Sequence, residues 1–297
     1  MGFLSLQNVV LGLIEGGIYG LLAVGIVLVY RGSRVLNFAQ GEIGTIGLFV
    51  AWFLVTDRGY PWIVGAIGAV LVATAIGLGF ERLVVRKMAD GTRISVAVAT
   101  VGLLLFLLSL GFVLFGESPR SVRGPIAGQG VSLAGVNVSP TQILSLVITL
   151  AIGFGLAALL QRTDFGLAVL AAADDPSAVR LVGASLAKVS AFTWGAGAAI
   201  SALAVLLIEP SIGVFGPGFA SELFVYAMTA ALVGGLASLP GAFVGGLAVG
   251  LLKVFVTSAT ITSSLPGIPI LSVFALILVV LLARPGGLFG AKPPAIA

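Results

Sequence analysis

The amino-acid sequence predicts an all-α membrane protein, a polytopic bundle of about eight to nine transmembrane segments. Of its 297 residues, 59% are hydrophobic and 9% are charged, whereas about 25% of the residues of a soluble domain are charged. The mean hydropathy of +1.21 leaves too little polar surface to cover a globule in water. The apolar residues also fall in runs of about 20, the length that a helix needs to cross a bilayer.

Nine apolar runs mark the segments that we expect to be helical. They comprise residues 9–30, 38–55, 62–80, 94–115, 142–160, 189–208, 222–235, 241–257 and 268–283. The run 222–235 is too short to span a membrane comfortably. We therefore expect a broken or re-entrant helix pair within 222–257, although a tightly packed helical hairpin fits the same pattern. The expected bend contains the residues Gly234, Gly235, Pro240 and Gly241.

Lysine and arginine are unevenly divided between the two sets of loops. One set holds eleven of these cations, and the other holds Arg58, Arg120 and Arg123. Cytoplasmic loops carry the excess of lysine and arginine, so we expect the eleven-cation side in the cytoplasm, the N-terminus outside and the C-terminus inside. The same excess accounts for the net charge of +4, and no nucleic-acid partner is expected.

The chain shows no sign of a separate soluble domain, and residues 1–297 are expected to form a single transmembrane domain. No cleavable signal peptide is evident, so the first apolar run is expected to be a retained helix. Two loops are longer than tight turns. The loop at about 116–140 is expected outside, and the loop at about 162–188 is expected in the cytoplasm.

Several classes of enzyme and metal site are excluded by residues that the sequence lacks. It contains no cysteine and no histidine, which removes thiol catalysis, serine–histidine dyads and metal sites built from these residues. It also lacks the phosphate-binding motif G-x-x-x-x-G-K-S/T, so the chain is not expected to hydrolyse ATP by itself. We expect no catalytic residue, no metal and no cofactor bound by this chain.

The internal loop carries the signals of a short helix. Asp175 is a good N-cap, because its carboxylate can accept the free N–H groups of a first turn, and Pro176 suits the first helical position. Asp174 adds negative charge at the positive end of the helix dipole, and Gly183 can end the helix. A helix of about two turns with an apolar face is therefore predicted at 176–182. It would either dock into a groove of a partner protein or lie on the membrane surface.

A polar segment stands where a cationic loop enters the second apolar run. Residues 36–42, LNFAQGE, place Asn37, Gln40 and Glu42 at a helix start, with Gly41 among them. Polar groups near a membrane segment usually face protein or a water-filled path, and a helix start presents unpaired N–H groups. A substrate or gating element and a helix cap at the membrane interface both remain open.

Ionisable residues within the apolar runs are a further candidate. Glu15 lies beside Gly12, Gly16 and Gly20, whose spacing of four is typical of a close-packing helix face. A charge within a membrane costs about 2.5–3.5 kcal/mol. Glu15 is therefore expected either to line a path or, as we favour, to form a hydrogen bond across a helix contact. Lys253 is expected to extend towards the membrane interface.

The stretch 234–246, GGLASLPGAFVGG, is the last candidate. Its glycines, with Ser238 and Pro240, are typical of a break between two half-helices. Broken helices often mark binding sites near the bilayer midplane. A tightly packed hairpin is an equally good interpretation.

Three stretches together resemble the permease subunits of branched-chain amino acid ABC importers, the LivH-like half of such a pair. They are GLIEGGIYGLLAVGIVLVYRGSRVLNFAQGE, FGLAVLAAADDPSAVRLVG and GGLASLPGAFVGG. The resemblance runs nearly end to end. The family often has His where Gln40 stands, and related permeases import urea, short amides or other small solutes, so the resemblance does not fix the solute.

The resemblance implies a single permease domain in a bacterial or archaeal plasma (inner) membrane, which moves branched-chain amino acids or related small polar solutes. The implied partners are a second, LivM-like permease subunit, two ABC ATPase subunits that use ATP, an extracytoplasmic solute-binding protein and membrane lipid. The residues of the implied ATPase-coupling helix are Asp174, Asp175, Pro176, Val179, Arg180, Val182 and Gly183. The candidate residues of the substrate pathway are Glu15, Asn37, Gln40, Gly41, Glu42 and Ser238.

The main alternative is a self-sufficient secondary transporter or channel for small solutes. Such a protein needs charges near the membrane midplane for ion coupling, and here Glu15 and Glu42 are the candidates. An intramembrane enzyme is disfavoured, because no nucleophile–base pair is evident. The working permease pair consists either of two copies of this chain or, as we favour, of two different chains.

Overall fold

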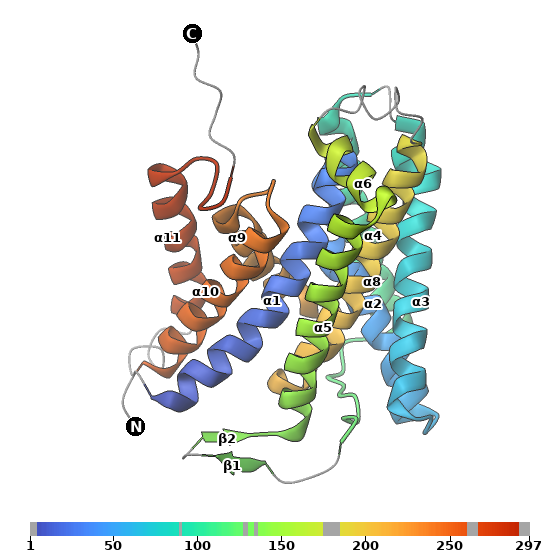
Figure 1. Cartoon of the computed structure of the whole chain (residues 1–297). Coiled ribbons are helices and arrows are strands. Elements are labelled where there is room, and N and C mark those ends of the chain that lie inside the picture. The colour runs from blue at the N-terminus through green and yellow to red at the C-terminus, as the bar shows by residue number, and fades with distance from the viewer. Residues whose placement is uncertain are drawn as a thin grey trace. The chain divides into compact units, whose positions relative to one another are not determined.

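The computed structural model describes residues 5–88, 91–126, 130–133, 136–174, 185–259 and 267–290. Within these ranges the chain is helical apart from one short hairpin, an isolated β-bridge and the connecting turns (Figure 1). This confirms the predicted all-α membrane fold class. The α-helices are α1 (Leu6–Ser33), α2 (Gln40–Trp52), α3 (Trp62–Phe80), α4 (Arg93–Phe115), α5 (Pro140–Arg162), α6 (Asp164–Asp174), α8 (Leu186–Ile212), α9 (Phe219–Gly234), α10 (Leu239–Ser258) and α11 (Ile268–Ala283).

Two helices change geometry at their C-terminal ends. The helix α2 continues into the π-helical turn Phe53–Asp57, and α3 continues into the π-helical turn Glu81–Val85 and the 3-10 turn Arg86–Met88. The loop predicted outside contains an antiparallel pair of short strands, β1 (Val131–Leu133) and β2 (Val136–Val138).

Six helices in the described ranges are long and apolar enough to cross a membrane by length and composition. They are Leu6–Ser33, Trp62–Met88, Arg93–Phe115, Pro140–Arg162, Leu186–Ile212 and Leu239–Ser258. The apolar helices α9 and α11 have 16 residues each, or about 24 Å at the helical rise, which is less than the hydrocarbon thickness of about 30 Å. All nine predicted runs form helices. The run 222–235, expected to be too short to span a membrane, lies in the 16-residue helix α9.

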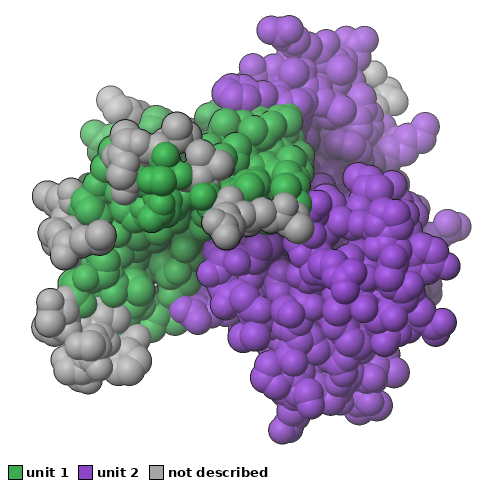
Figure 2. Space-filling view, turned by 90° about the horizontal axis from the view of Figure 1, so that it is seen from below, with its two compact units in different colours: residues 1–27, 126–153, 225–297 green, residues 28–125, 154–224 purple. Residues whose placement is uncertain are grey.

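The chain divides into two compact units, which Figure 2 shows in different colours. Unit 1 comprises residues 1–27, 126–153 and 225–297, and unit 2 comprises residues 28–125 and 154–224. The helices α1, α5 and α9 each contribute residues to both units. Because each unit consists of separate stretches of the sequence, the units are not successive pieces of the chain. A single domain over 1–297 stays a prediction.

Small residues bring the helices of unit 2 together. A Cβ atom at Gly44 of α2 would lie 2.7 Å from the Oγ of Ser201 in α8. A Cβ atom at Gly77 of α3 would lie 2.7 Å from the Cβ of Ala198, also in α8. Glycines at such positions allow helix backbones to approach closely. They make α8 the helix against which α2 and α3 pack.

Burial separates central from peripheral helices. In α8, 72% of the spanning window is buried, whereas in α4 and α5 the share is 17%. The peripheral helices expose large apolar side chains, such as Val113 of α4 and Phe154 of α5. In a membrane such side chains face lipid or another apolar helix, since neither requires polar cover.

Candidate functional site

The polar segment at the start of α2 forms a buried hydrogen-bond network in unit 2. The side chains of Asn37, Gln40 and Glu42 are at most 1% exposed. The Nδ2 of Asn37 donates to the Oε1 of Gln40 at 3.0 Å, and the Nε2 of Gln40 donates to the carbonyl of Gly197 at 2.6 Å. The hydroxyl of Ser201 donates to the carbonyl of Gln40. Gln40 therefore connects α2 to α8 through both its side chain and its backbone.

Glu42 and Thr45 connect α2 to the first turn of α9. The hydroxyl of Ser221 donates to the Oε1 of Glu42 at 3.1 Å, and the N–H of Ala220 donates to the Oγ1 of Thr45 at 3.3 Å. A Cβ atom at Gly41 would lie 2.7 Å from the carbonyl oxygen of Ala220. Glycine at this position is what allows α9 to approach α2 so closely.

These contacts bear on the two interpretations of the polar segment. Ala39 precedes α2 without a side-chain capping hydrogen bond, and the Oδ1 of Asn37 accepts the N–H of Ala39 at 3.1 Å. The polar side chains thus join α2 to neighbouring helices. The assignment of Asn37, Gln40 and Glu42 to the substrate pathway stays a prediction, and it requires that the helices around them separate to admit a solute.

Glu15 forms an ion pair with Lys253 in unit 1. The Nζ of Lys253 lies 2.7 Å from the Oε2 of Glu15, and the hydroxyl of Tyr19 donates to the same oxygen at 3.2 Å. Glu15 thus makes the hydrogen bond across a helix contact that we favoured from the sequence. The ammonium of Lys253 pairs with Glu15, and its expected extension towards the membrane interface stays a prediction. A role for Glu15 in the substrate pathway stays a prediction.

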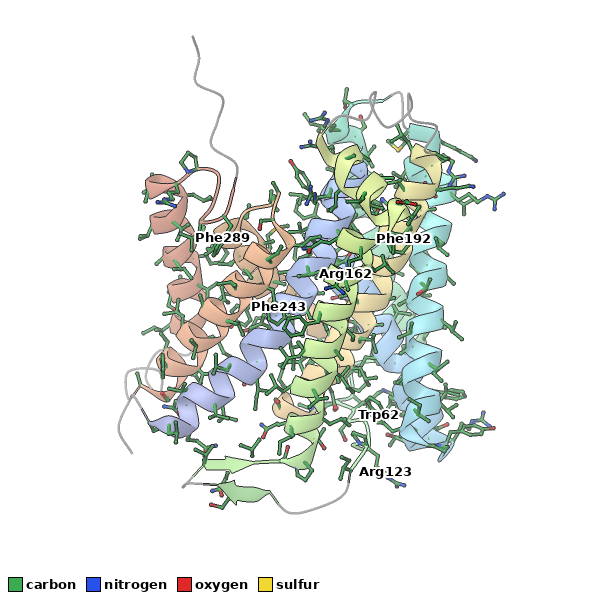
Figure 3. All side chains as sticks on the ribbon, viewed as in Figure 1. Trp62, Arg123, Arg162, Phe192, Phe243 and Phe289 are labelled. Atoms are coloured by element: carbon green, nitrogen blue, oxygen red, sulfur yellow. The ribbon has the colours of Figure 1, made fainter. Side chains whose placement is uncertain are left out.

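Glycines on both helices bring α1 and α10 into backbone contact. A Cβ atom at Gly16 would lie 2.8 Å from the carbonyl oxygen of Gly246, and one at Gly250 would lie 2.2 Å from the Cα of Gly16. Further along α1, Gly20 contacts Phe243, which is labelled in Figure 3. The predicted close-packing face of α1 is therefore confirmed, and α10 is its partner.

Ser238 caps α10 at the predicted bend. Its Oγ accepts the N–H of Gly241 at 3.0 Å, and Gly235 adopts a φ of 100° that favours glycine. A Cβ atom at Gly245 would lie 2.3 Å from the carbonyl oxygen of Ala230. The helices α9 and α10 are therefore a closely packed hairpin that turns at the expected residues. A solute contact at Ser238 stays a prediction.

A short segment after α11 completes the end of α9, which the sequence did not lead us to expect. The N–H of Leu288 donates to the carbonyl of Val233 at 2.8 Å, and the N–H of Phe289 donates to the carbonyl of Gly234 at 3.2 Å. These carbonyls belong to the last turn of α9, whose acceptors have no partner within the helix. The glycines after Arg284 are the sequence signal for a turn at this place. In the structure Gly287 adopts a φ of 79°, which favours glycine.

The internal loop begins with α6, which packs against α8 within unit 2. The rings of Phe165 in α6 and Phe192 in α8 lie 5.2 Å apart in a T-shaped arrangement, and the side chain of Val169 is fully buried. Phe192 is labelled in Figure 3. Asp174 is the last residue of α6. The remaining residues of the predicted coupling helix lie outside the described residues; they are Asp175, Pro176, Val179, Arg180, Val182 and Gly183. The coupling helix stays a prediction.

Sequence reasoning missed most partners of the polar residues. The contact between Tyr19 and Glu15 could have been predicted, because Tyr19 follows Glu15 by four positions and residues four apart are neighbours on a helix. Ser201 and Ser221 are 161 and 179 positions from the residues that they contact. No pattern in a single sequence connects such distant positions.

The chain is similar to permease proteins of bacteria over nearly its whole length and to one of an archaeon over 80% of its length. The family model for the permease component of branched-chain amino acid transport systems matches residues 8–283. The chain is 31% identical to the high-affinity branched-chain amino acid transport system permease protein BraD of Pseudomonas aeruginosa, with 96% of this chain and 95% of that protein covered. It is 29% identical to the LivH protein of Escherichia coli, with the same coverage. It is 25% identical to a probable LivH protein of Methanocaldococcus jannaschii, with 80% of this chain and 76% of that protein covered.

Proposed function

Because the chain belongs to the family of permease components of branched-chain amino acid transport systems, we propose that it works as the membrane-spanning permease subunit of an ATP-driven (ABC) importer. One observation carries this proposal. The family match begins within α1 and ends at the last residue of α11, so it covers the full set of described helices. The match therefore concerns the whole membrane architecture and not one motif.

The proposed solutes are branched-chain amino acids, with urea and amides as related small polar alternatives. The relatives BraD and LivH are named for branched-chain amino acid transport, which makes these amino acids the first solutes to test. Glu15 and Lys253 are paired with each other, and Glu42 and Glu209 are buried. A separate binding protein is therefore expected to supply most of the affinity, while this chain provides a weak, passing site.

The proposed complex contains this chain, a LivM-like second permease, two ABC ATPase subunits and an extracytoplasmic solute-binding protein. The cation-rich side, including the loop at about 162–188, is proposed to lie in the cytoplasm, where the ATPases bind. The residues 174–183 would transmit closure of the ATPase pair to the spans. Alternating access to the two sides of the membrane would follow from ATP binding and hydrolysis in the partners.

Uptake by the reconstituted complex tests this function. We would measure accumulation of radiolabelled L-leucine in proteoliposomes that contain the complete importer and its binding protein, with and without ATP. We expect uptake to require ATP and to fall at least tenfold in the double variant D175A/R180A, because the proposed coupling helix loses its cap and a charged contact. The control D57A/R58A makes the same chemical changes at an exposed ion pair in a loop expected outside and is expected to keep uptake within about twofold of wild type.

Two results would contradict different parts of the proposal. Uptake at the wild-type rate in D175A/R180A would show that these residues do not couple the ATPases to transport. Leucine uptake by this chain alone, without ATP or ATPase subunits, would replace the importer by a self-sufficient secondary transporter.

A further inference from the structure

The contact between α1 and α10 contains an ion pair that helix packing does not require. Glycines on both helices already place the two backbones in contact, with Gly250 against Gly16 and Gly246 against Gly20. A buried ion pair is often no more stabilising than apolar side chains of similar volume. Ionisable residues within spans are rare and usually mark a path for a solute or ion. The pair formed by Glu15 and Lys253 is therefore better explained by a function than by assembly alone.

The ion pair is partly accessible, in contrast to the polar network of unit 2. The side chains of Glu15 and Lys253 are 16% and 21% exposed, whereas those of Asn37 and Gln40 are at most 1% exposed. An ammonium carries three N–H donors and a carboxylate has two acceptor oxygens. Their contact with each other leaves capacity for a further charged group.

The pair lies towards one end of each helix. Glu15 is nine residues from the first residue of α1, and Lys253 is five residues from the last residue of α10. These separations correspond to about 14 Å and about 8 Å along the helix axes. In the proposed orientation both of these helix ends face the outside, the side from which a binding protein delivers the solute.

Tyr19 is placed to hold the carboxylate of Glu15 independently of Lys253. Its hydroxyl donates to the Oε2 of Glu15, and its ring packs against that of Tyr226, with 5.2 Å between the ring centroids. Both tyrosines are at most 2% exposed. Packing therefore fixes the donor, and Glu15 would keep one partner when Lys253 turns to another group.

We propose that Glu15 and Lys253 form a transient binding site for the zwitterionic head of an amino acid. The ammonium of the solute would pair with Glu15, and its carboxylate would pair with Lys253, in place of the contact between the two side chains. Every charge stays paired during this exchange, so the span never holds an isolated charge. Urea and amides carry no charge to exchange. The inference rests on the proposed function and deepens it, because it selects amino acids from the candidate solutes.

Photolabelling of the complete importer tests this site. The probe is L-photo-leucine, an α-amino acid with a diazirine in its side chain, applied to proteoliposomes, with labelled peptides identified by mass spectrometry. We expect labels on α1 and α10 of the wild-type chain and at least a tenfold loss of these labels in E15L/K253L. The control E81L/R86L removes another ion pair of the chain, with 2.9 Å between its charged atoms, and is expected to keep the wild-type labels.

If E15L/K253L fails to assemble, the single variant E15Q still tests the proposed site. E15Q keeps the size of the side chain and a partner for Tyr19 but removes the negative charge, and we expect at least a threefold loss of label. Labels of wild-type intensity in the assembled variants, or labels confined to other helices, would overturn the site. ATP-dependent leucine uptake by the wild type, measured in parallel, separates these outcomes. A failed site with intact uptake leaves the proposed function standing, whereas absent uptake contradicts the proposed function itself.

Discussion

At the scale of single residues, burial decides how much a polar side chain contributes to stability. Gln40 and Gln7 each make two hydrogen bonds through the side-chain amide, but Gln40 is fully buried, whereas the bonds of Gln7 to Asn137 are exposed. Water can replace a partner only at the exposed site. Replacing Gln40 with leucine leaves the amide of Asn37 and the carbonyl of Gly197 buried without this partner.

We therefore predict that Gln40→Leu lowers the free energy of unfolding by about 1–3 kcal/mol, the usual cost of a buried polar group that loses its partner. Gln7→Leu makes the same chemical change and is expected to cost less than about 0.5 kcal/mol. Unfolding of the purified protein by a denaturing detergent, followed by circular dichroism, gives both values. Equal losses in the two variants would show that the network of Gln40 does not stabilise α2 against α8.

At the scale of helices, the contact between α1 and α10 depends on the absence of side chains. A Cβ atom at Gly246 would lie 2.2 Å from the backbone nitrogen of Gly20, and backbone atoms cannot move aside as a flexible side chain can. We predict that Gly246→Ala separates the two helices and destabilises the protein by about 1–3 kcal/mol, the usual cost of overpacking. The same detergent titration measures the change.

Gly155 provides the matched control for this prediction. It lies within α5, and a Cβ atom there would meet nothing within 4 Å. Alanine favours a helix over glycine by up to about 1 kcal/mol, so Gly155→Ala is expected to leave stability unchanged or to raise it. A loss in Gly155→Ala as large as that in Gly246→Ala would contradict the assignment of the loss to the close contact at Gly246, because Gly155 has no such contact.

The sequence predicts the helices themselves better than it predicts which helices pack against one another. The spans follow from hydrophobic length, which is a local property, and all nine runs are helical. The packing face of α1 follows from its glycine spacing, and the bend at Gly235 follows from local turn chemistry. The helix α6 and the strands β1 and β2 were missed, because short elements in loops have little periodicity.

The candidate site residues show the same contrast between local features, which the sequence predicts, and long-range contacts, which it does not. Glu15 was recognised as an intramembrane charge, but its partner Lys253 is 238 positions away, and only the folded chain brings the two together. The burial of Gln40 also depends on α8, which the sequence of α2 does not indicate. Residue chemistry is thus predictable from the sequence, whereas residue pairing over long separations is not.

At the scale of the whole molecule, the division into two units does not follow the order of the chain. The helices α1, α5 and α9 run from one unit into the other. The loops of both units belong to one chain, because helices shared by the units connect them. The lysine and arginine bias of these loops therefore predicts a single orientation for the whole chain.

Cysteine labelling tests this orientation without background, because the chain contains no cysteine. Tyr60 lies in a loop expected outside, and Ala187 lies in the first turn of α8, which is expected in the cytoplasm; both are exposed. The variants Tyr60→Cys and Ala187→Cys retain every lysine and arginine, so the charge bias that sets the orientation is unchanged. We predict that a membrane-impermeant maleimide labels Tyr60→Cys in intact cells at least tenfold more than Ala187→Cys. Permeabilised cells should label both equally, and the reverse pattern in intact cells would place the cation-rich loops outside, where cytoplasmic ATPases could not reach residues 174–183.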